Sequence, residues 1–151
     1  IGGKLSENMK QQFIVENRAG AAGTIGTAHV VNSAPDGYTL LVASAGAITT
    51  APSMYQKLPY DPLRDLTPIM NIVFQPNILV VHPSVPVTTT KEFIALAKAN
   101  PNKFTYGSSG VGATQHLASE LFSLMTGARL VHVPYKGGGP AMAGIMSGEI
   151  D

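Results

Sequence analysis

The sequence predicts an open α/β fold built mostly from parallel strands. Short aliphatic runs are each followed by a Gly- or Ser-rich turn and then by a helical segment, and this order repeats along the chain. Hydrophobic residues make up 44% of the 151 residues and charged residues 13%, so the chain can bury a core of its own. Ligands of such sheets bind at the carboxyl ends of the strands, which makes the turns the expected functional region.

The first half of the chain alternates helical and aliphatic segments. Helices are predicted at residues 4–12, 24–33 and 48–55. Strands are predicted where β-branched and aliphatic residues cluster, at 13–16, 38–43, 69–74 and 78–81. Asp36 lies in a Pro-Asp-Gly turn that ends the second helix, and Pro76 separates the last two strands because it cannot donate a ladder hydrogen bond.

The second half shows clearer boundaries. Thr89 and Glu92 have the spacing of a capping box, in which each residue satisfies an amide at the start of a helix. Helices are predicted at 93–99, 113–125 and 140–147, and strands at 104–107 and 130–133. Apolar positions 113, 117, 121, 124 and 125 lie on one face of the middle helix.

Composition and motifs exclude several classes of function. The chain has no cysteine, which removes disulfides, thiolate metal sites and cysteine catalysis. A net charge of +1 without basic runs argues against nucleic acid as a partner. No Walker phosphate loop and no Gly-x-Ser-x-Gly elbow occur, and the four histidines lack metal-ligand spacing. We therefore expect no catalytic residues, no metal site and no cofactor.

The segment 106–116 is the strongest candidate for a binding site. Two serines and two glycines stand between a predicted strand and a helix, where free backbone amides can bind an anion. A second opening of this kind follows at 134–140. The alternative is that both are ordinary helix caps, in which a Ser or Thr side chain satisfies the terminal amides.

Two other features have competing interpretations. The glycines of residues 20–26 resemble a dinucleotide-binding loop, but their spacing differs and no acidic residue ends a second strand. His116 and Glu120 are four residues apart on one helix, so a structural contact between them is favoured over a metal site. His132 lies in an aliphatic strand and is expected to be a core or interface residue.

Four motifs in series resemble one family. They are Glu16-Asn-Arg-Ala-Gly-Ala-Ala-Gly23, Ala34-Pro-Asp-Gly-Tyr-Thr-Leu-Leu41, Tyr106-Gly-Ser-Ser-Gly110 with Gln115-His-Leu-Ala118, and Val131-His-Val-Pro-Tyr-Lys-Gly137. In this order and spacing they resemble the Bug family, the TctC-type periplasmic solute-binding receptors of tripartite tricarboxylate transporters. The resemblance covers the whole chain.

The resemblance implies a periplasmic binding protein of the type II-like α/β fold, with mostly parallel sheets and two lobes that close over a small carboxylate. Residues 1–74 would form part of the first lobe and residues 75–151 the second. The implied ligand contacts are Ser44, Ala45, Ser108, Ser109, Gly110, Gly112, Thr114, Gln115, Tyr135, Lys136 and Gly137. Ala113 stands where the family often has serine, so Thr114 is the expected hydroxyl donor.

The resemblance also implies partners and a location. Membrane transporter subunits are the implied partners, a sensor kinase is a compatible further one, and the implied compartment is the periplasm. The family's first ligand loop would precede Ile1 and its returning segment would follow Asp151, so we expect a fragment with an incomplete first lobe. The rival interpretation is a nucleotide-dependent α/β oxidoreductase that uses the Gly20–Gly26 loop.

Overall fold

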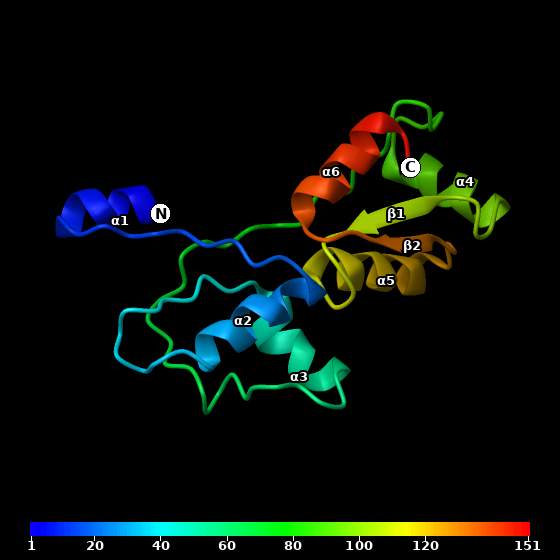
Figure 1. Ribbon diagram of the computed structural model, residues 1–151. Helices are drawn as coiled ribbons and strands as arrows, with labels where there is room; N and C mark the ends of the chain where they lie inside the picture. The colour runs from blue at the N-terminus through cyan, green and yellow to red at the C-terminus, as the bar shows by residue number, and fades with distance from the viewer.

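A two-stranded parallel sheet organises the C-terminal half of the protein. The computed structural model describes residues 1–151. Strand β1 (Thr105–Ser108) pairs with β2 (Val131–Pro134), and helix α5 (Thr114–Thr126) joins them in a βαβ unit. Helices α5 and α6 (Gly138–Ser147) lie on opposite faces of the sheet (Figure 1). The predicted α/β class with a parallel sheet is confirmed.

Aromatic side chains form the main core, between helix α4 (Thr90–Ala99) and the sheet. Phe93 is 5% exposed and meets Phe104 edge-on, with ring centroids 5.9 Å apart. Phe122 of α5 stacks on the other side of Phe93 at 6.1 Å. Because these rings come from α4, α5 and the residue just before β1, burying them fixes the three elements together.

The predicted Thr89 cap at the start of α4 is confirmed, whereas Glu92 reaches one residue further back than a capping box requires, to Thr88. The Glu92 backbone N–H donates to Thr89 Oγ1 at 3.2 Å, and the Glu92 carboxylate accepts from the Thr88 N–H at 2.7 Å. These hydrogen bonds lower the pKa of Glu92, the one from Thr88 N–H most of all. Backbone N–H groups at the start of α4 therefore find acceptors on neighbouring side chains of the same chain.

Replacing Thr89 with alanine tests this cap. We expect the free energy of unfolding to fall by about 1 kcal/mol, the usual effect of losing an N-cap hydroxyl. Urea unfolding of the full-length protein measures it. Thr90→Ala is the matched control, since Thr90 is the first helical residue and makes no side-chain hydrogen bond. Equal stability of both variants would show that the cap contributes nothing.

The N-terminal half contains short helices that pack on one another. Helix α2 (Thr24–Val31), the π-helical turn η2 (Gly46–Thr50) and α3 (Ala51–Met54) form one group, and α1 (Gly2–Met9) stands apart from it (Figure 1). The Tyr60 hydroxyl fastens a following loop to this group by donating to the Ala47 carbonyl at 2.7 Å. The 3₁₀ turn η1 (Ala21–Gly23) leads into α2.

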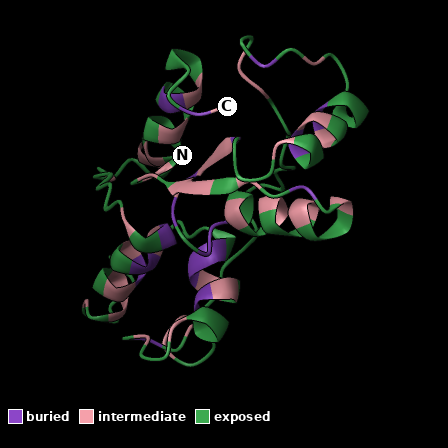
Figure 2. Ribbon diagram, turned by 90° about the vertical axis from the view of Figure 1, so that its right-hand side faces the viewer, coloured by how far each residue is buried: buried purple, intermediate pink, exposed green.

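Four predicted strands, at 13–16, 38–43, 69–74 and 78–81, are wrong for this structure. No backbone–backbone hydrogen bond joins any of them to a neighbouring segment. Most of their apolar side chains are exposed, for example Phe74 at 91% and Ile14 at 85% (Figure 2). A strand needs a hydrogen-bonded neighbour. An aliphatic run without a pairing partner therefore does not become part of a sheet.

Helix α5 packs through a different face from the one that its apolar pattern suggests. Phe122 and its neighbours turn toward the core, whereas Leu121, Leu124 and Met125 are 55%, 83% and 77% exposed. The apolar stripe is present at helical spacing, yet it has no partner in this structure. None of the helices combines the length and the apolar character needed to cross a bilayer.

Candidate functional site

Loops from both halves of the chain meet at the start of η2. The Ser44 hydroxyl donates to the Ala22 carbonyl at 3.1 Å, which ties the 44–46 turn to η1. Gly46 is buried, and a Cβ atom built there would lie 3.2 Å from both the Ala22 and the Gly112 carbonyl oxygens. Three loops thus approach one another through main-chain atoms, and a side chain at position 46 would force its neighbours to move.

The η1 turn is held in a conformation that its residues seldom adopt. Ala21 and Ala22 have φ angles of 45° and 53°, although neither is glycine. Backbone strain of this kind persists where the surroundings determine the conformation, and it concentrates at ligand-binding sites. Ala22 is buried against Gly46 and Gly110. This conformation is a property of the backbone and not of a particular side chain. The sequence therefore predicts only a Gly-x-x-Gly loop here.

Gly110 brings the second-half loop against η1. Its φ angle is 135°, a region closed to residues with a side chain, and a Cβ atom would lie 3.1 Å from the Ala22 nitrogen. A Cβ atom built at Gly112 would likewise lie 3.1 Å from the Met54 sulfur. These two predicted site glycines therefore lie directly at the contact between the halves.

The helices that begin at these loops have free amides. Neither α5, which starts after Ala113, nor α6, which starts after Gly137, has a side-chain cap. The amides of Thr114 and Gln115 have no backbone acceptor. Helices α1, α2 and α3 also lack a side-chain cap, so α5 and α6 are distinguished by their position beside the 108–112 and 135–137 loops, where their N–H groups can bind an anion.

Side chains of the 108–115 segment divide into buried and exposed groups. Ser108 is 1% exposed, and its hydroxyl bonds to main-chain atoms of Gly110 and to His132. Ser109 donates to the Gln115 side-chain oxygen at 3.1 Å. Thr114 and Gln115 are exposed at the open end of α5. The structure thus brings these predicted residues together, with Ser108, Gly110 and Gly112 buried and Thr114 and Gln115 exposed.

The 135–137 turn presents its main chain rather than its ring. The Tyr135 ring packs beside Gly107 and Gly144, and its hydroxyl is buried without a hydrogen-bond partner. Its carbonyl oxygen lies 3.8 Å from the Cβ position of Gly110. Lys136 is exposed and takes part in none of the salt bridges. Any ligand contact from Tyr135 would therefore come from its main chain.

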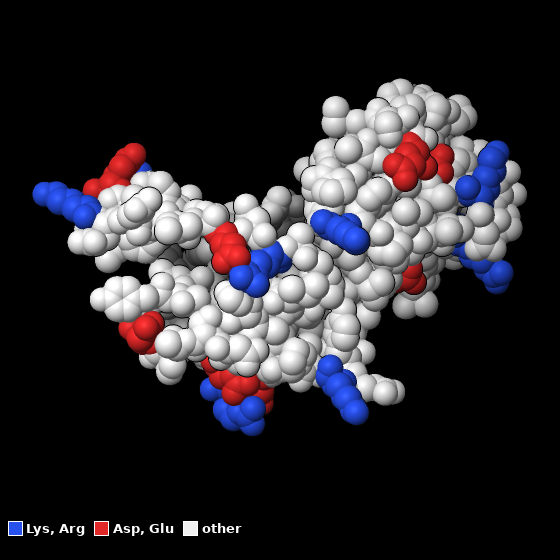
Figure 3. Space-filling view, viewed as in Figure 1, with Lys and Arg blue, Asp and Glu red and all other residues white.

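Charges are sparse across the molecule. The face shown in Figure 3 carries a few small groups of charged side chains, in several of which opposite charges lie side by side, and no basic patch. No group of three His, Cys, Asp or Glu residues is close enough to hold a metal ion. A hollow of about 470 Å³ between Asn102 and Leu130 lies at the far end of α5 from the loops and includes none of the predicted site residues.

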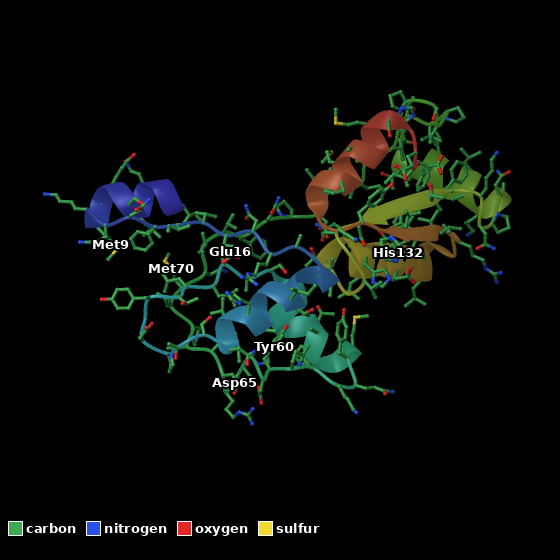
Figure 4. The ribbon with its side chains drawn as sticks, viewed as in Figure 1. Met9, Glu16, Tyr60, Asp65, Met70 and His132 are labelled. Atoms are coloured by element: carbon green, nitrogen blue, oxygen red, sulfur yellow. The ribbon has the colours of Figure 1, made fainter.

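An aromatic and imidazole cluster lies beneath the 108–112 loop. His132, labelled in Figure 4, projects from β2 and stacks between Tyr106 at 4.9 Å and His116 at 4.2 Å between ring centroids. The predicted His116–Glu120 contact is wrong, because Glu120 accepts from the Tyr106 hydroxyl at 2.6 Å while His116 Nδ1 accepts from the Gly112 N–H at 3.2 Å.

Burial lowers the pKa of the His132 imidazole below its ordinary value of 6.5, and the neighbouring His116 lowers it further, while Glu120 opposes the shift. Burial also raises the pKa of the Tyr106 phenol, and its hydrogen bond to Glu120 adds to this effect. Both groups are thereby kept neutral around pH 7. The predicted place of His132 in the packed part of the fold is confirmed.

The rival nucleotide loop lacks its structural context. The Gly20–Gly26 segment forms a 3₁₀ turn and the start of α2, and it follows an extended segment that belongs to no sheet. A dinucleotide site needs a strand that runs into the glycine turn, since the strand aligns the turn with the helix axis. Nothing in this geometry favours a nucleotide.

The chain is similar to a set of curated proteins. A profile of the family described as tripartite tricarboxylate transporter family receptor matches residues 1–151. Protein BugT of Bordetella pertussis is 38% identical over 147 residues, which cover 97% of this chain and 45% of BugT. A UPF0065 protein of Cupriavidus necator is 38% identical over 145 residues, covering 96% of this chain and 44% of that protein.

Solved structures show the same likeness. An R. palustris protein with adipate superimposes with a TM-score of 0.95 at 38% identity, covering 99% of this chain and 50% of that one. MatC from Rhodopseudomonas palustris with bound malate has a TM-score of 0.90 at 27% identity, covering 99% of this chain and 51% of MatC. Periplasmic binding protein BugD has a TM-score of 0.83 at 32% identity, covering 99% of this chain and 50% of BugD. The chain spans about half the length of these relatives, and it belongs to the tripartite tricarboxylate transporter receptor family, the TctC or Bug family of periplasmic solute-binding proteins.

Proposed function

We propose that this chain is part of an extracytoplasmic receptor that captures a small carboxylate between two lobes and delivers it to the membrane subunits of a tripartite tricarboxylate-type transporter. The observation that carries the proposal is the meeting of η1, the 44–46 turn and the open N-terminus of α5. Free amides beside loops from the other half of the chain suit a carboxylate that both halves grip.

The likeness to structures that hold carboxylates supports this choice. The related proteins with adipate and with malate both contain a small dicarboxylate. A carboxylate at a helix N-terminus gains about 0.3–1 kcal/mol from the dipole. Each charge-assisted hydrogen bond adds about 1.5–3 kcal/mol. Such contacts reach a useful affinity without any catalytic group, so we propose a receptor and not an enzyme.

Each predicted site residue has a proposed role. The main chains of Gly110, Gly112 and Gly137 let the loops approach, and the side chains of Ser44, Ser109 and Gln115 supply polar contacts. Thr114 offers the exposed hydroxyl, and Lys136 offers a free positive charge. The remaining predicted residues would hold the loops in place and not contact the ligand through their side chains; they are Ala45, Ser108 and Tyr135. We place the first lobe at 1–74, the second at 75–151 and the hinge near 72–77.

A thermal-shift screen of the full-length receptor tests this function. We expect adipate, malate or another small carboxylate to raise the unfolding temperature in a concentration-dependent way, because a ligand that binds only the native state stabilises it. NAD and NADP serve as the comparison ligands. Stabilisation by either nucleotide and by no carboxylate would overturn the receptor and favour the oxidoreductase interpretation.

A further inference from the structure

The Tyr135 ring is wedged between the sheet and helix α6. A Cβ atom built at Gly144 of α6 would lie 2.8 Å from Tyr135 Cζ and nearer still to the hydroxyl oxygen. The opposite edge of the ring faces β1, where a Cβ atom built at Gly107 would lie 3.3 Å from Tyr135 Cε2. The ring thus fills the space that side chains at these two positions would need.

Both glycines stand where the backbone does not require glycine. Neither Gly107 nor Gly144 has a positive φ angle, and each lies inside a regular element, β1 or α6. Glycine inside a strand or a helix is less stable than alanine, and it often marks the close approach of another group. Room for the Tyr135 ring is therefore what the two glycines supply here.

Helix α6 is fastened at its C-terminal end, so it has little freedom to move away from the ring. The Gly144 carbonyl accepts from the Glu149 N–H at 2.9 Å, which closes the end of the helix. Beyond it, Ile150 is 4% exposed, and Asp151 Oδ2 accepts from the Thr105 N–H at 2.8 Å. A methyl group at position 144 would therefore displace the ring and not the helix.

The main chain of Tyr135 connects the ring to the candidate site. Its N–H donates to the Ser108 carbonyl at 3.0 Å. Its carbonyl oxygen lies 3.8 Å from the Cβ position of Gly110, which packs against Ala22 of the other half. Residues 136–137 then lead into the open start of α6. A displaced ring would shift this turn and the Gly110 loop together, and hydrogen bonds to a ligand weaken steeply when their alignment is lost.

We infer that Gly107, Gly144 and the Tyr135 ring are positioning residues, which set the 135–137 turn and the adjoining Gly110 loop for carboxylate binding. The inference rests on the proposed function. The ring acts through its shape, because its hydroxyl is buried and makes no hydrogen bond. Burial, and after it the nearby Glu149 carboxylate, raise the pKa of the phenol, so the ring stays neutral.

Alanine at position 144 tests the positioning by overpacking. We expect Gly144→Ala to bind adipate or malate about tenfold more weakly or worse, measured by calorimetry on the full-length receptor. Adding Tyr135→Phe removes the oxygen atom nearest to the new methyl group, so the double variant should bind at least about threefold more tightly than Gly144→Ala alone.

Gly3→Ala is the matched control, since it makes the same change in helix α1, where nothing lies within 4 Å of the Cβ position. We expect it to bind as the wild type does. Wild-type affinity in Gly144→Ala would overturn the inference, as would a double variant that binds as weakly as the single one.

Substitutions of Tyr135 test the same positioning without overpacking. Tyr135→Phe keeps the ring and should bind within about threefold of the wild type. Tyr135→Leu leaves the space between the two glycines partly empty and should bind about tenfold more weakly. Equal affinity of the two variants would contradict a role for the ring, and this pair decides the matter if Gly144→Ala does not fold.

Amide hydrogen exchange tests the coupling without any ligand. We expect the Tyr135 and Gly110 amides to exchange faster in Gly144→Ala than in the wild type, relative to the amides of α4, and to slow again in the double variant. Unchanged exchange at both amides would mean that the ring does not hold the loops. If no carboxylate binds the wild type, the proposed function fails, and the exchange rates alone decide whether the ring positions the turn.

Discussion

Replacing Gly46 with valine is expected to weaken carboxylate binding by about ten- to a hundredfold, because overpacking a tight contact costs about 1–3 kcal/mol. Gly46 has an ordinary φ angle, so the added side chain causes steric conflict and little backbone strain. That conflict falls on Ala22 from one loop and Gly112 from another. The expected result follows from forcing these loops apart, and calorimetry with adipate or malate measures it.

A second glycine supplies the control. Gly3 in α1 has nothing within 4 Å of its Cβ position, so Gly3→Val leaves the loops unchanged. We expect Gly3→Val to bind as the wild type does. Wild-type affinity in Gly46→Val would show that the three loops do not have to meet for binding, and the site would then have to be placed elsewhere.

Truncation of Phe93 is expected to give the largest loss of stability. Phe93 is 5% exposed and contacts both Phe104 and Phe122, so Phe93→Ala removes the ring that joins α4 to the sheet and to α5. Cavities of this kind cost about 3–5 kcal/mol in free energy of unfolding. Chemical denaturation of the full-length protein measures the change.

The conservative variant Phe93→Leu shows whether the loss of stability comes from the lost packing volume or from any substitution at this position. Leucine fills much of the same volume, so we expect its cost to be about 1–2 kcal/mol, well below that of alanine. Equal and small losses in both variants would mean that the aromatic cluster is not the main core of this half of the chain.

Local signals in the sequence predicted the second half well. The Thr89 cap, the glycine that ends α5 and the glycine that ends α6 each have a specific backbone conformation, and all three lie where the pattern placed them. Helix ends of this kind depend on a few neighbouring residues. They are therefore readable without knowledge of the tertiary structure.

Partner-dependent features could not be predicted in the same way. An aliphatic run such as 69–74 shows β propensity, but whether it becomes a strand depends on a neighbour elsewhere in the chain. The apolar stripe on α5 shows helical periodicity, yet the pattern does not say which face finds a partner. Ala22 was missed because its role lies in its backbone conformation, and the Tyr106–Glu120 contact because those residues are 14 positions apart.

The charge requirement of the ligand gives the most direct test of the account. Calorimetry of the full-length receptor with adipate and with its neutral diamide compares two ligands of nearly equal shape. We expect saturable one-to-one binding of a dicarboxylate and at least about tenfold weaker binding of the diamide, because free amides at the starts of α5 and α6 favour an anion. Equal binding of the two ligands would contradict a carboxylate receptor.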